Sequence, residues 1–456
     1  MSVTIMQTTQ SREPKILITP PGPRARELFA KYTQALSQSV VGFYPLVADS
    51  ASGCIVRDVD GNEFIDFNSG LAVMNVGHSH PRVVKAIREQ SEKLLHYAWT
   101  DFCYKPIVDL AEQLMAITPG THSKRVFFAN GGAEANEAAM KLSRWHSRKP
   151  LFLAFTNSFH GRTFGTMSLT ASKPVQRRHF FPLVPETTHV PYPYCYRCPF
   201  HLTYPDCGLW CVDFIEEDVL KKFHPPEDTA AMFIEPIQGE GGYVVPPDEY
   251  FPRLKKLLDK YRILMVDDEV QSGIGRSGKW LAIEHWHGVT PDIVTVAKAL
   301  GGGLPLSAAI AREELMDWES GSHANTMGGN PVCCAAGLQV LSIIRDEKLL
   351  ENATKQGEYL VKRLTEMQDE HSMIGDVRGK GLMVGAELVK DQDTKEPAAQ
   401  EATDLINKCF KRGLAIITSG KCTIRFAPPL IISREILDAG LEVFEGALKE
   451  VAAQLK

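Results

Sequence analysis

The sequence lacks the features that would direct a protein to a membrane or to nucleic acid. No apolar run reaches the roughly 20 residues that a membrane-spanning helix requires, and the N-terminus has no charged-then-apolar leader pattern. An excess of basic residues is also missing, since the formal net charge is −5, and nucleic acid would need a positive field. We therefore expect a cytoplasmic protein that binds neither membrane nor nucleic acid.

Cysteine is scarce, with 10 residues in a chain of 456, and scattered cysteines in a reducing cytosol are expected to be buried thiols. Four of them nevertheless gather in one segment, as Cys195 with Cys198 and Cys207 with Cys211, and His201 lies between the pairs. This spacing is compatible with a tetrahedral zinc ion, with two disulfides, or with simple packing as thiols. The pattern alone does not choose among the three.

What the chain does contain is enough apolar material for a large globular protein. Hydrophobic residues make up 44% and charged residues 23% of the sequence, as in ordinary soluble proteins, and the length predicts two or three lobes. In the middle of the chain, short apolar runs alternate with helical stretches, which is typical of strands buried on both faces of a mainly parallel sheet. We therefore predict an α/β fold. The runs cover 126–129, 151–155, 232–234, 263–266 and 293–296.

The two ends of the chain have different patterns. Residues 1–23 are polar and rich in proline and are expected to form a loose arm, followed by strands within 53–67 and a helix from Pro81. Beyond residue 335 we expect one long helix, several strands and a final amphipathic helix. These later strands are expected near 382–384, 414–417 and 423–426. The predicted division is 1–70 for the arm and part of a small domain, 71–335 for a large domain, and 336–456 for a C-terminal small α+β domain.

The polar residues that follow each apolar run are the ones to examine, because ligands of such sheets bind beyond the carboxyl ends of the strands. The first run leads into Gly131 and Gly132 at the start of a helix, where free N–H groups and the helix dipole favour phosphate. A tight turn is the alternative interpretation. The run at 232–234 leads into a glycine-rich loop with Glu235 and Glu240, and this loop could equally be a solvated one.

Charged residues follow the last two runs as well. Asp267, Asp268 and Glu269 come after a buried strand, where acids are costly unless cations accompany them, and a cationic cofactor nitrogen would serve as one. Lys298 follows the final run, and burial there would lower its pKa and make it a nucleophile. A lone lysine is more often a surface group, but its combination with the other three loops favours a functional site.

Together these residues resemble a known family. A strand-end Asp followed downstream by a strand-end Lys, here Asp268 and Lys298, is the arrangement of fold-type-I pyridoxal-phosphate enzymes. More narrowly, the chain resembles the class III aminotransferases, which include 4-aminobutyrate, ornithine and acetylornithine aminotransferases. The resemblance implies a large domain with a mainly parallel seven-stranded sheet, a smaller α+β domain, and pyridoxal 5′-phosphate as cofactor. It is carried, in family order, by 66–81, 131–134, 158–163, 235–242, 268–271, Lys298, 326–331 and 424–429.

The resemblance assigns roles toward the cofactor. Lys298 would hold it as a Schiff base and shuttle a proton, and Asp268 would keep the pyridine nitrogen protonated so that the ring accepts electrons. Thr326 would reach the phosphate of the neighbouring subunit, which implies a homodimer with shared active sites and leaves a tetramer open. The other predicted cofactor-binding residues are Gly132 and Ala133 at the phosphate, Phe159 and Val270 on the ring faces, Gln271 at the phenolic oxygen, and His160 and Glu235.

Substrate roles follow from the same resemblance. Arg425 would bind an α-carboxylate with its planar fork, Glu240 would pair with Arg425 when the substrate has no such group, and Arg162 would bind a second carboxylate. Ordinary ion pairs are the alternative roles of the arginines, with Glu235 as the partner expected for Arg162. The chain departs from the family pattern at Ala133, where Ser or Thr is usual.

Two positions narrow the expected substrate. Leu71 stands where ornithine aminotransferases carry tyrosine and His160 where they carry tryptophan, so both favour 4-aminobutyrate or a related ω-amino acid, with 2-oxoglutarate as amino acceptor. The alternatives left open are an amino acid racemase on the same scaffold, an ornithine- or acetylornithine-type aminotransferase, and a non-catalytic relative whose cysteine loop binds a partner. That cysteine loop is expected to lie near the active-site mouth.

Overall fold

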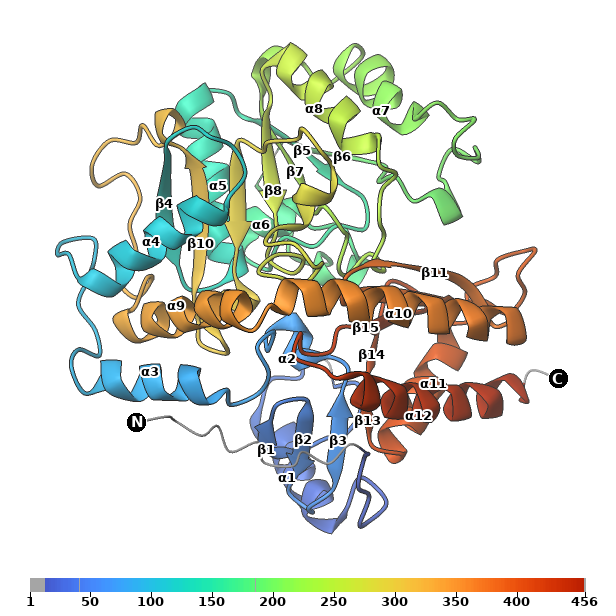
Figure 1. Ribbon diagram of the computed structural model, residues 1–456. Helices are drawn as coiled ribbons and strands as arrows, with labels where there is room; N and C mark the ends of the chain where they lie inside the picture. The colour runs from blue at the N-terminus through green and yellow to red at the C-terminus, as the bar shows by residue number, and fades with distance from the viewer. Residues whose placement is uncertain (1–12, 41, 185, 455–456) are drawn as a thin grey trace.

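The computed structural model describes residues 13–40, 42–184 and 186–454, which contain three β-sheets (Figure 1). The largest is a seven-stranded sheet with the order β4-β10-β9-β8-β7-β5-β6, and all its strands are parallel except β10. Every residue of β7 and β9 is buried, as strands covered on both faces must be. The predicted mainly parallel sheet is therefore confirmed. The bounds are β4 Lys124–Ala129, β5 Leu151–Phe155, β6 Thr187–Val190, β7 Thr229–Ile234, β8 Leu264–Asp268, β9 Ile293–Val296 and β10 Ser307–Arg312.

Helices pack against this sheet and bury their apolar stripes. The helix α5 (Gly132–Ser147) lies on the central strands, and α8 (Tyr250–Tyr261) packs on β8 with Phe251, Leu254 and Leu258 buried. Their spacing of three and four residues is the one that predicts this helix from the sequence. The helices α4 (Lys105–Ile117) and α6 (Phe164–Leu169) cover β4 and β5, and α7 (Trp210–Phe214) packs on α8.

The chain before α1 (Pro23–Ala35) is attached to the fold from its first described residues. Lys15 forms a bridge with Glu63, and Asn62 Oδ1 accepts hydrogen bonds from Leu17 N at 2.8 Å and Ile18 N at 3.0 Å. The prediction of a loose arm is therefore wrong for residues 13–23, because these backbone groups find partners on the first sheet. The part of that prediction that concerns residues 1–12 lies outside the described residues.

The two smaller sheets combine the beginning and the end of the chain. One has the order β1-β2-β3-β13, in which β13 runs parallel to β3, and the other has the antiparallel order β11-β12-β15-β14. Phe64 of β3 stacks on Phe410 at 5.5 Å between ring centroids, which places an N-terminal side chain in the C-terminal core. The strand bounds are β1 Ala48–Ser52, β2 Ile55–Asp58, β3 Glu63–Asp66, β11 Ile374–Lys380, β12 Met383–Leu388, β13 Leu414–Ala415, β14 Ile417–Ser419 and β15 Thr423–Phe426.

The long helix expected after residue 335 is two helices, α9 (Pro331–Asp346) and α10 (Leu349–Glu370). Lys348 stands between them with φ of +52°, a left-handed conformation that a right-handed helix cannot include. The break lets α9 pack against α3 (Pro81–Ser91) and α4 while α10 packs against β11 (Figure 1). The remaining helices are α2 (Ser69–Ala72), α11 (Ala399–Lys411) and α12 (Arg434–Ala452). In the part of the chain that the structure describes, no helix is both long and apolar enough to cross a membrane.

One buried arginine joins these parts. Arg276, which follows β8, is fully buried and donates hydrogen bonds to Leu382 O at 3.0 Å, Pro428 O at 2.6 Å and Asn75 Oδ1. The three acceptors belong to the turn between β11 and β12, the segment after β15, and the N-terminal part of the chain. The planar guanidinium directs its Nη1 and Nη2 donors to three separate acceptors, a geometry that the single ammonium group of lysine would not reproduce.

We expect Arg276→Met to lower the free energy of unfolding by roughly 3 kcal/mol or more, since each hydrogen bond to a charged group contributes about 1.5–3 kcal/mol. The thermal midpoint of the cofactor-free protein measures this. Arg412→Met, which removes a surface partner of Glu450, is the matched control and should change stability by about 0.5 kcal/mol or less. Equal midpoints for the two variants would contradict the role given to Arg276.

Candidate active site

The residues predicted to bind a cofactor converge on one cavity of about 510 Å³. It lies at the edge of the seven-stranded sheet where β8 and β9 end, which is the edge at which parallel sheets bind ligands. Thr326 is the member of the predicted set that lies elsewhere, exposed on the surface. The predicted residues that line the cavity are Gly132, Ala133, Phe159, His160, Arg162, Glu235, Asp268, Val270, Gln271 and Lys298.

Asp268 is held at the end of β8 by three partners. His160 Nδ1 lies 2.7 Å from Asp268 Oδ2, Asn136 Nδ2 donates to the same oxygen at 2.7 Å, and Val270 N donates to Oδ1 at 3.0 Å. Burial disfavours a charge on His160, but the hydrogen bond and charge of Asp268 outweigh it and raise the pKa of His160. These three hydrogen bonds fix the orientation of the Asp268 carboxyl group, which lines the cavity.

The other two acids of this segment are not paired with cations. Asp267 is fully buried, and neither of its carboxylate oxygens has a hydrogen-bond partner among the described residues. Burial, followed by the charges of Glu269 and Asp268, raises the pKa of Asp267 well above its usual value. Burial also raises the pKa of Glu269 to about 8 although Ser272 and Ile283 N donate to it. Among the described residues, Asp268 is the member of this group of three acids that has a basic side chain, His160, within hydrogen-bond distance.

Lys298 follows β9 and lines the same cavity. Burial lowers its pKa to about 8, helped by the positive charge of Arg425 and opposed by Glu240, Asp268 and Glu235. A substantial fraction of the amine is therefore neutral near physiological pH, which is the form that attacks an aldehyde. The backbone φ of Lys298 is +41°, a conformation that costs of the order of 1–3 kcal/mol for a residue with a side chain.

The N-terminus of α5 offers the anion-binding end of the cavity. Gly131, Gly132 and Ala133 line it at the start of the helix, where the first N–H groups have no partner within the helix. A Cβ at Gly132 would lie 2.8 Å from Val270 Cγ1, so glycine lets Val270 stand over the turn. The two interpretations of this turn, a tight turn and an anion-binding site, are therefore compatible. Glycine is needed because Val270 packs closely on the turn, and the free backbone amides of the same turn can bind an anion.

These residues fit pyridoxal phosphate by the chemistry of their donor set. The amides at Gly132 and Ala133 suit its phosphate, the carboxylate of Asp268 suits a protonated ring nitrogen, and the amine of Lys298 suits its aldehyde. Val270 and Phe159 give the cavity two apolar walls for a flat ring. Asn136 is a further residue of this site that the sequence analysis missed, although a polar residue on the buried face of α5 is a signal that could have revealed it.

A second group of charges stands next to this cavity. Arg425 Nη1 lies 2.9 Å from Glu240 Oε1, and Lys173 Nζ lies 3.6 Å from the other oxygen, Glu240 Oε2. Burial alone would raise the pKa of Glu240, but the charges of Arg425, Lys173 and Lys298 hold it below its usual value. Arg425 is only 3% exposed. The pair Glu240–Arg425 is referred to below as the gate, and Lys173 is a partner that the sequence analysis did not anticipate.

Arg162 does not form the ion pair with Glu235 that was considered as its alternative role. The two oxygens of Glu235 accept from Gly239 N and Phe159 N, both at 3.0 Å, and burial raises the pKa of Glu235 to about 7. The guanidinium of Arg162 lies over the Phe159 ring at 5.5 Å from its centroid. Among the residues described, Arg162 has no ion pair, and its exposed side chain is available for an anionic ligand.

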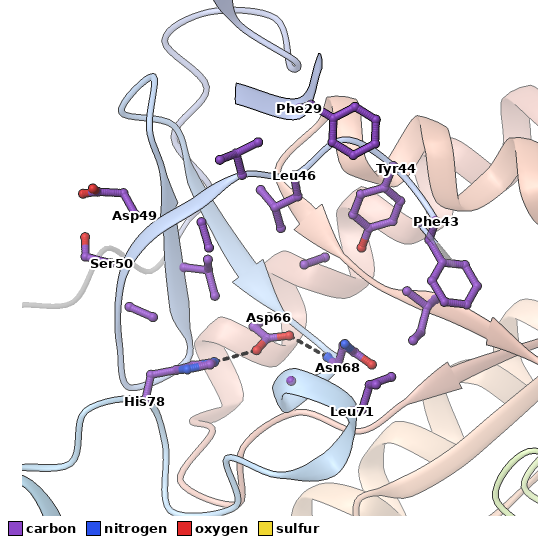
Figure 2. Close-up of a pocket in the computed structure, with 18 of the residues that line it drawn as sticks. Phe29, Phe43, Tyr44, Leu46, Asp49, Ser50, Asp66, Asn68, Leu71 and His78 are labelled. Carbon is purple, nitrogen blue, oxygen red and sulfur yellow. Dashed lines mark hydrogen bonds and ion pairs between the residues drawn. The ribbon is translucent and has the colours of Figure 1, made fainter. Parts of the chain in front are cut away.

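Leu71 lies in a second cavity, of about 770 Å³, beneath the N-terminal sheet (Figure 2). Asp66 orders the turn that carries it: Asp66 Oδ1 accepts from Asn68 N at 2.8 Å, and Asp66 Oδ2 lies 2.7 Å from His78 Nε2. Leu71 itself has φ of +68° and is 48% exposed. Figure 2 shows Leu71 and Phe43 among the residues that line this cavity, whose other walls include Ile417, the strand neighbour of Arg425.

The four clustered cysteines are free thiols around a small cavity of about 20 Å³. Burial, and then the neighbouring sulfurs, raises the pKa of Cys195 to about 11 and of Cys211 to about 12, so neither is a reactive thiolate at neutral pH. Among the described residues, the group whose potential ligand atoms all lie within 4.8 Å of one another is Glu370, His371 and Glu445. The four sulfurs do not meet this spacing in the structure, and zinc binding by them stays a prediction.

We expect the apoenzyme to react with pyridoxal phosphate faster as the pH rises through about 8, because Lys298 then becomes neutral. The rate at which the visible absorbance of the bound cofactor develops, measured against pH, checks this. Arg425→Met should move the midpoint upward, since it removes a positive charge that lowers the lysine pKa, and Arg412→Met should not. Borohydride reduction followed by peptide mapping should label Lys298, and a midpoint near the pKa of an ordinary lysine would contradict the expectation.

Known proteins resemble the chain over almost its whole length. The family described as Aminotransferase class-III matches residues 37–448. The leucine/methionine racemase of Thermococcus litoralis is 43% identical over 434 residues, covering 94% of this chain and 96% of that protein. The 4-aminobutyrate aminotransferase of Mycobacterium leprae is 38% identical over 440 residues, with coverage of 94% and 96%. A solved Bacillus anthracis aminotransferase has a TM-score of 0.87 at 32% identity, covering 94% of this chain and 99% of that one. The chain therefore belongs to the class III aminotransferase family and is a pyridoxal-phosphate-dependent enzyme.

Proposed function

We propose that the protein is a transaminase that moves the amino group of 4-aminobutyrate or a related ω-amino acid to 2-oxoglutarate. The observation that carries this proposal is the gate, a preformed contact of 2.9 Å between Glu240 and Arg425. Both charges act on the pKa of Lys298, so the gate is close to the amine at which the chemistry takes place. A gate of this kind lets one site accept substrates with and without an α-carboxylate.

The two substrates place opposite demands on Arg425. An ω-amino donor presents no α-carboxylate, and a buried guanidinium left without a partner would be costly, so Glu240 neutralises it. A 2-oxo acid brings an α-carboxylate that can displace Glu240 and pair with Arg425 through two parallel hydrogen bonds. Lys173, 3.6 Å from Glu240, gives the displaced carboxylate a remaining partner. The exposed Arg162 would bind the other carboxylate of 2-oxoglutarate or the carboxylate of the donor.

The residues around the cavity would divide the chemistry among them. Bound pyridoxal phosphate supplies an electron sink for the electron pair that remains when a C–H bond of the substrate breaks. Lys298 would hold the cofactor through its aldehyde and would carry a proton between the substrate carbon and the cofactor carbon. Asp268, positioned by His160 and Asn136, would keep a proton on the ring nitrogen. The amides at Gly132 and Ala133 would orient the phosphate.

An amino acid racemase on the same scaffold is the second candidate. It is favoured by the racemase of Thermococcus litoralis, which shares 43% of its residues with this chain against 38% for the Mycobacterium leprae aminotransferase. A racemase returns the proton to the same carbon and needs no 2-oxo acid. Its substrates always carry an α-carboxylate, so Glu240 would stay displaced from Arg425 during turnover. The preformed gate is the reason for placing the transaminase first.

The enzyme is expected to act as a homodimer. Thr326 is exposed and lies outside the cavity of its own chain, and the neighbouring Met327 is 52% exposed. A threonine that reaches the phosphate of a partner subunit would be placed in this way. Sedimentation equilibrium should give twice the chain mass, or a multiple of it if two dimers associate. A monomer mass for an active enzyme would refute the shared site.

Adding 4-aminobutyrate or 5-carbon and longer ω-amino acids to the loaded enzyme, without acceptor, should convert the visible cofactor band to that of the amino form, and 2-oxoglutarate should restore it. Lys298→Ala should abolish the conversion, whereas Arg412→Met should retain it.

Incubation with single enantiomers of leucine, alanine and isoleucine without 2-oxo acid, followed by chiral chromatography, tests the second candidate. Racemisation with no band conversion by any ω-amino donor would refute the transaminase and support the racemase.

A further inference from the structure

One arginine contacts both segments that carry the gate. Arg378 of β11 donates from Nη2 to Gly242 O at 2.6 Å and from Nε to Tyr243 O at 3.2 Å. These carbonyls lie in the gate loop, residues 239–243, just after Glu240. Nη2 of Arg378 is also 3.3 Å from Thr423 Oγ1, on β15 and two residues before Arg425. A single guanidinium therefore joins the backbone that positions Glu240 to the strand that positions Arg425.

The approach of the gate loop to Arg378 is too close for a side chain. Gly242 has φ of +119°, and a Cβ there would lie 3.2 Å from Arg378 Nη2 and 3.0 Å from Thr423 Oγ1. Gly420 N donates to Glu240 O at 2.8 Å, so the turn between β14 and β15 holds the same loop from a second side. The backbone on both sides of Glu240 is thus held in place: Arg378 donates to two carbonyls after it, and Glu235 Oε1 accepts from Gly239 N before it.

Arg378 is itself fixed by a buried cluster. Glu387 of β12 is 2% exposed and lies 2.8 Å from Arg378 Nη2, and it also accepts from Tyr194 and Arg197. Tyr194 OH accepts from Arg378 Nη2 at 2.9 Å, and the Tyr194 ring lies 4.9 Å from the guanidinium carbon. Asp376 is a further partner of Arg378. Lysine would bring one point charge in place of a planar fork and could not satisfy these acceptors and the two loop carbonyls together.

We propose that Arg378 is a positioning residue that sets the contact between Glu240 and Arg425, and so determines how the enzyme divides its affinity between substrates with and without an α-carboxylate. The inference rests on the proposed function, because it needs a gate that opens. The contact between Arg425 Nη1 and Glu240 Oε1 is a hydrogen bond of 2.9 Å, and such a bond is lost when its two atoms separate to about 3.6 Å, so a small displacement of the gate loop would release Arg425 from Glu240. Arg425 would then be more available to an α-carboxylate and less well neutralised when none is present.

The test compares Arg378→Lys with Glu240→Gln and with their combination in the full-length holoenzyme. For Arg378→Lys we expect the KM for 4-aminobutyrate to rise roughly ten-fold while the KM for 2-oxoglutarate stays the same or falls, with kcat little changed. Calorimetric titration of the holoenzyme in its aldehyde form with 2-oxoglutarate should give unchanged or tighter binding, a readout that does not depend on turnover. Arg363→Lys, which keeps its contacts with Glu366 and Tyr359 on α10, is the matched control and should change neither KM.

The double variant Arg378→Lys with Glu240→Gln shows whether Arg378 acts through the gate. If it does, the double variant should have the same ratio of KM values as Glu240→Gln alone, since no gate remains to be positioned. Equal rises in both KM values for Arg378→Lys, or effects that multiply in the double variant, would overturn the proposal and leave the transaminase standing. If Glu240→Gln left the ratio of KM values unchanged, the role given to the gate would be refuted, and the proposed function would be refuted with it.

Tyr194→Phe provides a milder route if Arg378→Lys fails to fold. It removes one hydroxyl from the cluster around Arg378 and leaves the gate residues in place. We expect a shift of the KM ratio in the same direction by roughly three-fold. A soluble Tyr194→Phe enzyme with the wild-type ratio would overturn the role given to Arg378.

Discussion

The site depends on holding one carboxyl group, that of Asp268, in a fixed orientation at the buried edge of a sheet. His160 and Asn136 both lie 2.7 Å from the same oxygen of this group. His160 comes from the loop after β5 and Asn136 from α5, and Thr295 of β9 in turn donates to Asn136 at 2.8 Å. The contact around Asp268 thus requires β5, β8, β9 and α5 to be in place together. A sheet with this strand order is the arrangement that meets this requirement.

The neighbouring acids illustrate what happens without such partners. Asp267 and Glu269 share the segment of Asp268, yet burial raises the pKa of each, and the pKa of Glu235 is raised to about 7. Glu240, in contrast, has a pKa below its usual value because Arg425, Lys173 and Lys298 lie near it. The pKa of Lys298 is lowered mainly by burial, and the nearby carboxyl groups of Glu240, Asp268 and Glu235 oppose this shift without cancelling it.

Much of this could be predicted from the sequence, because continuous apolar runs and the residues after them report directly on a buried parallel sheet. Strands β6 and β10 escaped prediction, since β6 is a short polar edge strand and β10 is built mainly of alanine, neither of which gives a clear apolar signal. The break at Lys348 was missed because nothing in a lysine signals a left-handed conformation. Lys173 and Arg378 were missed for another reason: their roles arise from contacts across the fold, which have no local pattern. The residues at the strand ends were found because their roles are local to those strands.

The pairing of β13 with β3 also has a consequence for biosynthesis. Ile65 and Asp66 of β3 are aligned with Leu414 and Ala415, and Phe64 is covered by Phe410, so the first sheet to emerge from the ribosome is completed by one of the last segments to be translated. Until then one edge of β3 has no strand beside it, and an open edge can pair with other chains. The nascent polypeptide must therefore stay protected for most of its elongation, and a prematurely terminated chain would be a natural substrate for chaperones and proteases.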